Sequence, residues 1–291
     1  MTRDCLAPEP HTRKPLYKPP PKSCDSHVHV FGDFTKFPLS PTRSFTPPEA
    51  PVTDMRKMLD VIGIERAVIV HSSAYGLDIR VSEAAVLSDT EHLRGVAVTG
   101  PDTPQKDIER LNAAGFCGTR LSTVVKGTLS FNSLEAIAAN VRPFDWHIAV
   151  HINKSDELIA LAPRLLSMGN SFVIDHIARV RGDEGIHSPG YKVLIDLLAS
   201  GRCWVKVSAL HRTSSEDAPW NDMRPLVEGV LEARPDRVVW GTDWPHVNQY
   251  DSMQNDGDLL DAFAHWVSDE HLREQVLVHN PAVLYRFNQK E

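Results

Sequence analysis

The sequence lacks several features that would indicate particular classes of protein. It has no apolar run long enough to cross a bilayer, and its start is polar and proline-rich, unlike a signal peptide. It has no dense lysine or arginine run, and its formal net charge is -7, which argues against nucleic acid or an anionic membrane surface as a partner. Its four cysteines show neither metal-ligand spacing nor a disulfide framework. We therefore expect a cytoplasmic protein.

Strand-like and helix-like segments alternate along the chain. Amphipathic helical patterns include one with Thr53 as its N-cap and Gly63 as its stop, and one with Pro104 in its first turn and Gly115 as its terminator. The stretch 78–87 is the weakest helical pattern. Strand-like apolar runs precede Asp25 and then recur at 67–70, 95–98, 116–121, 147–152, 171–174, 203–207 and 237–240. Eight β/α units predict a (β/α)8 TIM barrel.

The chain is expected to form one barrel domain preceded by an arm. Residues 1–21 contain six prolines and predict a flexible, solvated arm to which we assign no chemistry. Residues 22–291 contain no internal linker, and a TIM barrel commonly occupies this length as one domain. The loop 31–51 carries four phenylalanines among prolines. It could cover the mouth of the barrel as an apolar lid or pack against the first helix.

Two motifs near opposite ends of the chain carry most of the functional signal. Asp25-Ser26-His27-Val28-His29 follows the first strand-like residues, and Gly241-Thr242-Asp243-Trp244-Pro245-His246 follows the eighth. Alternate side chains of a strand share a face, so His27 and His29 are predicted to line one cavity. The first and last strands of a closed barrel are neighbours, which would bring Asp243 beside them. An isolated His-x-His arises by chance in many proteins, but the paired positions strengthen the functional interpretation.

Further polar side chains stand at the predicted strand ends, where a barrel carries its chemistry. They are His71 with Ser72 and Tyr75, Arg120, His151, Asp175 with His176, and Lys206 with Ser208. Adjacent residues on a strand face opposite ways. If His176 faces the cavity, Asp175 is therefore expected to face away from it.

These motifs resemble the amidohydrolase superfamily, in particular the branch that contains 2-pyrone-4,6-dicarboxylate lactonase and related sugar-acid lactonases and lactone isomerases. The resemblance extends from Lys22 to Phe287 and is most specific at 25–32, 173–176 and 239–246. It implies a distorted, amidohydrolase-like barrel that hydrolyses a lactone bearing carboxylate or hydroxyl groups. Such a reaction needs a base for water and polarisation of the carbonyl. The matching residues are Asp243 as the base, with His27, His29 and His176 on the carbonyl oxygen or on a metal.

The resemblance also implies substrate-binding residues and shows two departures. Arg120 and Arg212 match the family's carboxylate-binding positions, although Arg212 could instead pair with Glu216 or Asp217 on its own loop. His151 replaces a tyrosine at the end of the fifth strand. Lys126 replaces a second arginine, or is a solvated loop cation. Lysine binds a carboxylate only as a point charge, so we expect an acidic substrate other than the pyrone dicarboxylate itself. Tyr75 and His246 complete the candidate substrate-binding set.

His151 raises the question of a metal. A single divalent ion such as zinc could use the nitrogen-rich set His27, His29, His151, His176 and Asp243. A fourth-strand lysine or glutamate that could bridge two ions is lacking. We favour no obligate metal, because the resemblance is strongest to the metal-independent branch. Alternative functions are a metal-dependent decarboxylase, a lactone isomerase, or a non-catalytic assembly subunit; the crowding of ionisable groups argues against the last. The expected partner is a small acidic lactone, and the sequence does not indicate an oligomeric state.

Overall fold

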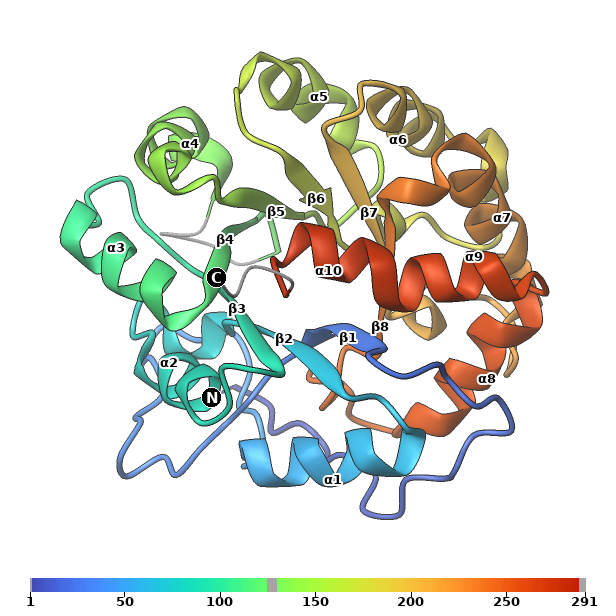
Figure 1. Cartoon of the computed structure of the whole chain (residues 1–291), viewed down its shortest axis with the longest axis horizontal. Coiled ribbons are helices and arrows are strands. Elements are labelled where there is room, and N and C mark those ends of the chain that lie inside the picture. Colours follow the sequence, from blue (N-terminus) through green and yellow to red (C-terminus); the bar gives the residue numbers. More distant parts are fainter. Residues whose placement is uncertain (1, 125–129, 288–291) are drawn as a thin grey trace.

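The computed structural model describes residues 2–124 and 130–287 and shows a parallel eight-stranded barrel surrounded by helices (Figure 1). The strands pair in sequence order. They are β1 (Cys24–Val28), β2 (Arg66–Val70), β3 (Leu93–Ala97), β4 (Phe116–Ser122), β5 (His147–His151), β6 (Phe172–Ile174), β7 (Cys203–Ser208) and β8 (Val238–Gly241). The predicted barrel is confirmed. The boundaries of β2 to β8 lie within two residues of their expected positions, whereas β1, expected before Asp25, continues through Asp25, Ser26 and His27 to Val28.

The helices between the strands bury their apolar faces against the outside of the barrel. They are α1 (Val52–Ile62), α2 (Arg80–Leu87), α3 (Gln105–Ala114), α4 (Leu134–Val141), α5 (Glu157–Ser167), α6 (Pro189–Ala199), α7 (Arg224–Ala233) and α8 (Asp256–Trp266). The weak pattern at 78–87 is thus a helix. Two starts differ from expectation: Pro51, not Thr53, occupies the N-cap of α1, and Pro104 is the N-cap of α3 rather than part of its first turn. Gly63 and Gly115 end these helices at φ 77° and 104°, as predicted.

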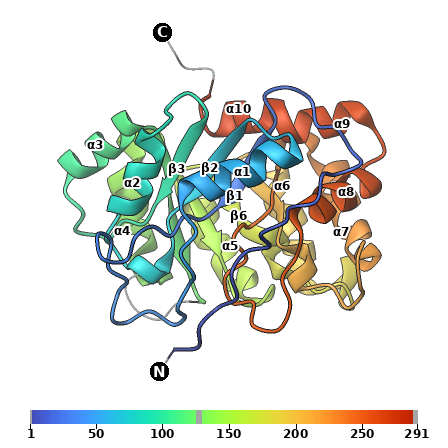
Figure 2. The ribbon, with the colours of Figure 1, turned by 90° about the horizontal axis from the view of Figure 1, so that it is seen from below.

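The end of the chain closes the bottom of the barrel. Helix α9 (Glu270–Glu274), a π-helical turn (Gln275–His279) and α10 (Asn280–Leu284) cross the barrel end opposite the functional loops (Figures 1 and 2). Tyr285 is fully buried there, with its ring 5.7 Å from that of His147. Asn280 Nδ2 donates to the carbonyl oxygens of Pro235 and Val238 at 2.7 and 2.6 Å. Side chains therefore fill this end, so access to the interior is from the carboxyl ends of the strands.

Asp25 links the first and last strands. Its Oδ1 accepts hydrogen bonds from the backbone N–H of His27 at 3.0 Å and of Thr242 at 3.1 Å, and its Oδ2 accepts from the Thr242 hydroxyl at 2.6 Å. The Asp243 N–H donates to His27 O at 2.9 Å, and Val28 bridges Trp244. A Cβ at Gly241 would lie 2.7 Å from the His27 nitrogen, so this close approach requires glycine. The two predicted motifs therefore meet through a buried carboxylate.

The loop after β1 contributes to both the core and the cavity. Phe31 is fully buried and stacks on Tyr75, with ring centroids 5.9 Å apart, so this end of the loop packs into the core. Phe45, farther along, lines the cavity described below.

No helix within residues 2–124 and 130–287 is long and apolar enough to span a membrane.

The proline-rich arm lies against the barrel through polar contacts that its composition did not indicate. Asp261 of α8 accepts hydrogen bonds from the backbone N–H groups of Leu16 and Tyr17 at 3.0 and 2.9 Å. The guanidinium of Arg13 donates to Asp258 at 2.7 Å and to Asp261 at 2.6 Å. At its start, the arm lies near the functional loops (Figure 2).

We predict that Asp25→Ala lowers the free energy of unfolding by about 3 kcal/mol or more, because it leaves two buried N–H groups and one hydroxyl without their acceptor. Asp25→Asn keeps the Oδ1 acceptor and can donate to the Thr242 hydroxyl oxygen, so it should cost much less. Denaturant unfolding of the three proteins at one pH measures both differences.

The same carboxyl group makes stability depend on pH. Burial raises the pKa of Asp25 to about 7, whereas an exposed aspartate ionises near 3.8. Between these values the folded chain holds a proton that the unfolded chain has lost, so this contribution is fully present below pH 3.8 and is lost as pH rises through about 7. The stability of the wild type relative to Asp25→Asn should therefore fall across this window. Parallel curves for the two proteins would contradict this assignment.

Candidate active site

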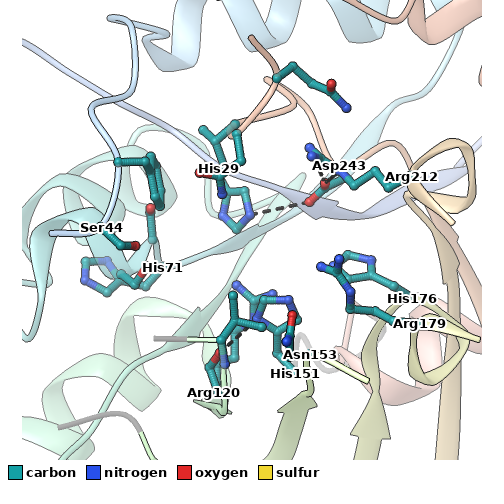
Figure 3. A pocket seen from close by; sticks show the side chains of 18 of the residues that line it. His29, Ser44, His71, Arg120, His151, Asn153, His176, Arg179, Arg212 and Asp243 are labelled. Carbon is teal, nitrogen blue, oxygen red and sulfur yellow. Dashed lines mark hydrogen bonds and ion pairs between the residues drawn. The ribbon is translucent and has the colours of Figure 1, made fainter. Parts of the chain in front are cut away.

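A cavity of about 650 Å³ opens at the carboxyl ends of the strands (Figure 3). Its walls come from the ends of the strands and from the loops that follow them. The lining includes Phe45, Asn153, Asn248 and Gln254 together with the ionisable residues His29, His71, Arg120, His151, His176, Arg179, His211, Arg212 and Asp243. Most of the strand-end residues that the sequence singled out are therefore brought to one cavity.

The two histidines of β1 and its extension meet Asp243 as predicted, but at different depths. His29 lines the cavity, whereas His27 is fully buried beneath it, so the expectation that both imidazoles line the cavity is half correct. Nε2 of each ring lies 3.6 Å from Asp243 Oδ1. The Nδ1–H of His29 donates to the Val70 carbonyl oxygen at 2.7 Å, which fixes its ring against β2.

A buried cluster of charges lies below His27. Lys206 on β7 is 1% exposed, and its Nζ lies 3.0 Å from His27 Nδ1 and 3.1 Å from Asp175 Oδ1. Arg120 Nε donates to Asp175 Oδ2 at 3.0 Å. Asp175 therefore faces the barrel interior, and the expectation that it faces away from the site is wrong. Strand β6 ends at Ile174 and His176 has a φ of 55°, so strand alternation no longer applies at these residues.

Arg212 holds the carboxylate of Asp243. Its Nε and Nη2 both lie 3.0 Å from Asp243 Oδ2, so the alternative pairing with Glu216 or Asp217 is not observed. Burial alone would raise the pKa of Asp243, but Arg212 and the neighbouring histidines outweigh it and hold the pKa well below its usual range. Asp243 is therefore an ionised acceptor at neutral pH, with Oδ2 on Arg212 and Oδ1 toward the two histidines.

The other predicted histidines are neutral groups on the cavity wall. Burial lowers the pKa of His176 to about 4, and burial followed by Arg120 lowers that of His151 well below its usual range. His176 Nδ1 lies 2.8 Å from the Ser208 hydroxyl oxygen, and His151 Nδ1 lies 3.0 Å from that of Ser122. Each ring is thereby anchored on a neighbouring strand.

Two predicted substrate-binding residues, Tyr75 and His246, are not found in the lining. Tyr75 accepts a hydrogen bond from the Gly32 N–H at 3.2 Å and stacks on Phe31, so its hydroxyl is used by the loop after β1. His246 is fully buried, with Nε2 2.9 Å from Asp256 Oδ1. Neither residue lines the cavity that the described residues form. Lys126 lies outside the described residues.

The five predicted metal ligands do not converge on one point. Within the described residues, two groups bring their donor atoms within 4.8 Å of one another: His27 with His29 and Asp243, and His27 with Asp175 and His176. His151 belongs to neither group, and its Nδ1 is directed at the Ser122 hydroxyl. His27 belongs to both.

Sequence reasoning missed Arg179 and His211. Both line the cavity, and Figure 3 shows Arg179 beside His176. Arg179 has a φ of 53°, and its Nε has no hydrogen-bond partner among the described residues. Its position three residues after His176 was the available signal, since the loop after a barrel strand faces the mouth. The lining now contains three arginines and one carboxylate, which makes the cavity electropositive although the whole chain is acidic.

The start of the arm joins two loops of the cavity mouth. Cys5 N–H donates to Thr46 O and Leu6 N–H donates to Gln249 O, both at 2.9 Å. The Asn248 N–H donates to Cys5 Sγ at 3.2 Å. Because Phe45, Asn248 and Gln249 belong to the lining, residues 2–6 tie together the loops that follow β1 and β8.

Comparison with known proteins agrees with this architecture. A protein-family model described as "Amidohydrolase" matches residues 24–287. The chain is 34% identical over 286 residues to a 4-sulfomuconolactone hydrolase of Hydrogenophaga intermedia, covering 97% of this chain and 94% of that protein. It is 32% identical over 284 residues to a 2-pyrone-4,6-dicarboxylate hydrolase of Comamonas testosteroni, covering 94% and 92%. A crystal structure of a probable 2-pyrone-4,6-dicarboxylic acid hydrolase from Acinetobacter baumannii, with citric acid bound, matches at a TM-score of 0.82 and 27% identity, covering 91% and 99%. With its barrel, its paired terminal motifs and these matches, the chain belongs to the amidohydrolase family.

Proposed function

We propose that the chain hydrolyses a lactone that carries an acidic substituent. The observation that carries this proposal is an ionised carboxylate, Asp243, at the floor of a cavity whose lining otherwise offers three arginines. An electropositive cavity favours an anionic substrate, and an ionised carboxylate beside it can take a proton from water. The two relatives are each named for a cyclic ester with an acidic group, which supports the same substrate class.

The reaction that fits this geometry is attack of water on the lactone carbonyl. Asp243 takes one proton from the water molecule. The oxygen of that water molecule bonds to the carbonyl carbon, and the carbonyl oxygen becomes an oxyanion. If the Ser208 hydroxyl donates to His176 Nδ1, the neutral ring carries its proton on Nε2 and can donate it to that oxyanion. Collapse of the intermediate breaks the ring C–O bond, and the leaving oxygen receives the proton that Asp243 had taken. The product is a hydroxy acid or its keto form.

The guanidinium groups are proposed to bind the acidic substituent. Arg212 contacts Asp243 through Nε and Nη2, and Arg120 contacts Asp175 through Nε. Arg179 carries no ion pair with the described residues, so it is the arginine with the most capacity left for a substrate anion. We therefore assign the principal anion contact to Arg179, with Arg120 assisting.

The donor set does not suit a resident metal such as zinc. His29 and Asp243 fit, since the Nδ1–H of His29 is used by a carbonyl oxygen and its Nε2 is directed at Asp243. His27 does not fit, because its Nδ1 faces the Lys206 ammonium rather than an acceptor. A ligating histidine normally donates its second N–H to an oxygen. We propose that hydrolysis needs no obligate metal.

Asp243→Asn keeps the shape of the side chain and removes the base. We expect kcat on the best acidic lactone to fall by roughly two to four orders of magnitude. Initial rates of proton release on carboxylated pyrones, muconolactones and aldonolactones measure both the substrate class and the loss. Asp251→Asn, which neutralises an exposed carboxylate at the mouth, is the matched control. Near-normal turnover in the Asp243 variant, or release of carbon dioxide from the best substrate, would rule out this assignment.

Removal of metal tests whether hydrolysis requires a bound ion. After chelation to less than about a tenth of an equivalent of zinc or manganese, the protein should keep its full activity. Elemental analysis and rate measurements on the same sample provide the comparison. Activity that follows metal content, and returns when zinc is added, would show that the reaction uses a metal.

Arg179→Met should raise KM for an acidic lactone roughly ten- to a hundredfold, which corresponds to one lost hydrogen bond to a charged group. The KM for a neutral lactone should change little. Arg181→Met is the matched control, because Arg181 lies on the same loop, is exposed and pairs with Asp183. Equal losses on acidic and neutral substrates would contradict the anion-binding role.

A further inference from the structure

The buried contact between Lys206 and His27 has no role in the reaction as described above. The three partners of this cluster, Lys206, His27 and Asp175, are at most 1% exposed. Lys206 Nζ lies 3.0 Å from His27 Nδ1 and 3.1 Å from Asp175 Oδ1. A buried lysine is retained at a cost in stability unless its partners use its charge and its protons. The contact with an imidazole nitrogen therefore needs an explanation.

The contact determines where the proton of His27 lies. An ammonium group has three donors and no acceptor, so the imidazole nitrogen that faces it must be the acceptor. His27 is fully buried and lies against the Lys206 ammonium, and both conditions disfavour a second positive charge, so the ring is neutral and has one N–H. That N–H is then on Nε2. In the structure Nε2 is buried and has no hydrogen-bond partner among the described residues, and Asp243 Oδ1 lies 3.6 Å from it.

We propose that Lys206 is a positioning residue that fixes His27 in the Nε2–H tautomer, and that His27 thereby directs an N–H at Oδ1 of Asp243. Arg212 holds Oδ2 of the same carboxylate from the other side. The two donors orient the carboxylate so that a lone pair remains toward the cavity for water. The catalytic part of this inference rests on the proposed role of Asp243 as the base, whereas the tautomer does not depend on it.

The opposite tautomer has a definite structural alternative. Asp175 Oδ1 lies 3.6 Å from His27 Nδ1 and could accept a proton from it if Lys206 were a neutral amine. The shorter distances favour an ammonium that donates to both His27 and Asp175. The alternative would leave a lone pair on Nε2, which is the atom that a metal beside His29 and Asp243 would require. The two arrangements therefore differ in a property that can be observed directly.

The tautomer is measured by long-range ¹H–¹⁵N NMR on the full chain labelled with ¹⁵N-histidine, with the His27 signals identified by their loss in His27→Gln. We expect His27 to show a protonated Nε2 and an unprotonated Nδ1. A protonated Nδ1 in the wild type overturns the proposal, whatever the substrate or the base proves to be. Loss of the Asp243 assignment would leave this result unchanged, so the two failures are distinguishable.

Lys206→Met removes the donor and keeps an unbranched side chain. We expect the His27 proton to move to Nδ1, zinc to bind more tightly than to the wild type in a competition titration, and kcat to fall roughly ten- to a hundredfold with little change in KM. Lys206→Gln retains an N–H donor without the charge and should recover the Nε2–H tautomer and part of kcat. Lys192→Met, an exposed lysine on α6, controls for the loss of one charge. An unchanged tautomer in Lys206→Met, or no recovery in Lys206→Gln, refutes the role of Lys206; if neither variant folds, the wild-type spectrum decides.

Discussion

The buried carboxylate of Asp25 is the interaction on which the arrangement of the site depends. It accepts hydrogen bonds from the backbone N–H groups of His27 and Thr242 and from the Thr242 hydroxyl. These bonds hold β1 and the turn after β8 in a fixed register. His27 and Asp243 follow these clamped residues directly. Barrel closure brings the end of β1 beside the end of β8, and it thereby places Nε2 of His27 and of His29 each 3.6 Å from Asp243 Oδ1.

Charge in the site is arranged in two layers. The lower layer, formed by Lys206, Asp175 and Nε of Arg120, is closed to solvent, and its charges pair with one another. The upper layer faces the cavity and has more cationic than anionic groups. Ion pairing in the lower layer limits the free-energy cost of burying its charges. The cationic groups of the upper layer that have no anionic partner remain available to a ligand. An acidic chain can thus present an electropositive cavity.

Much of this organisation could be predicted from local patterns. Strand periodicity places His27 and His29 on one face, and the order of strands in a closed barrel places Asp243 beside them. The prediction was wrong where the strand pattern ended. Asp175 and His176 both face the interior, because β6 ends at Ile174 and His176 has a positive φ. Tyr75 and His246 form hydrogen bonds with Gly32 and Asp256 and do not line the cavity. Backbone conformation after a strand depends on long-range contacts that a local pattern does not contain.

The sequence by itself determined the class of fold, the ends of the chain that must meet, and the polar residues at strand ends, because all three follow from periodicities of two and of about 3.6 residues. Only the tertiary structure decided how deeply each of these side chains is buried and which residue it contacts. It put His27 below the cavity, Lys206 on the ring of His27, Arg212 on Asp243 and Arg179 into the lining. These pairings join residues from different strands and from loops, and their distances are set by packing around the closed barrel, which no stretch of sequence specifies alone.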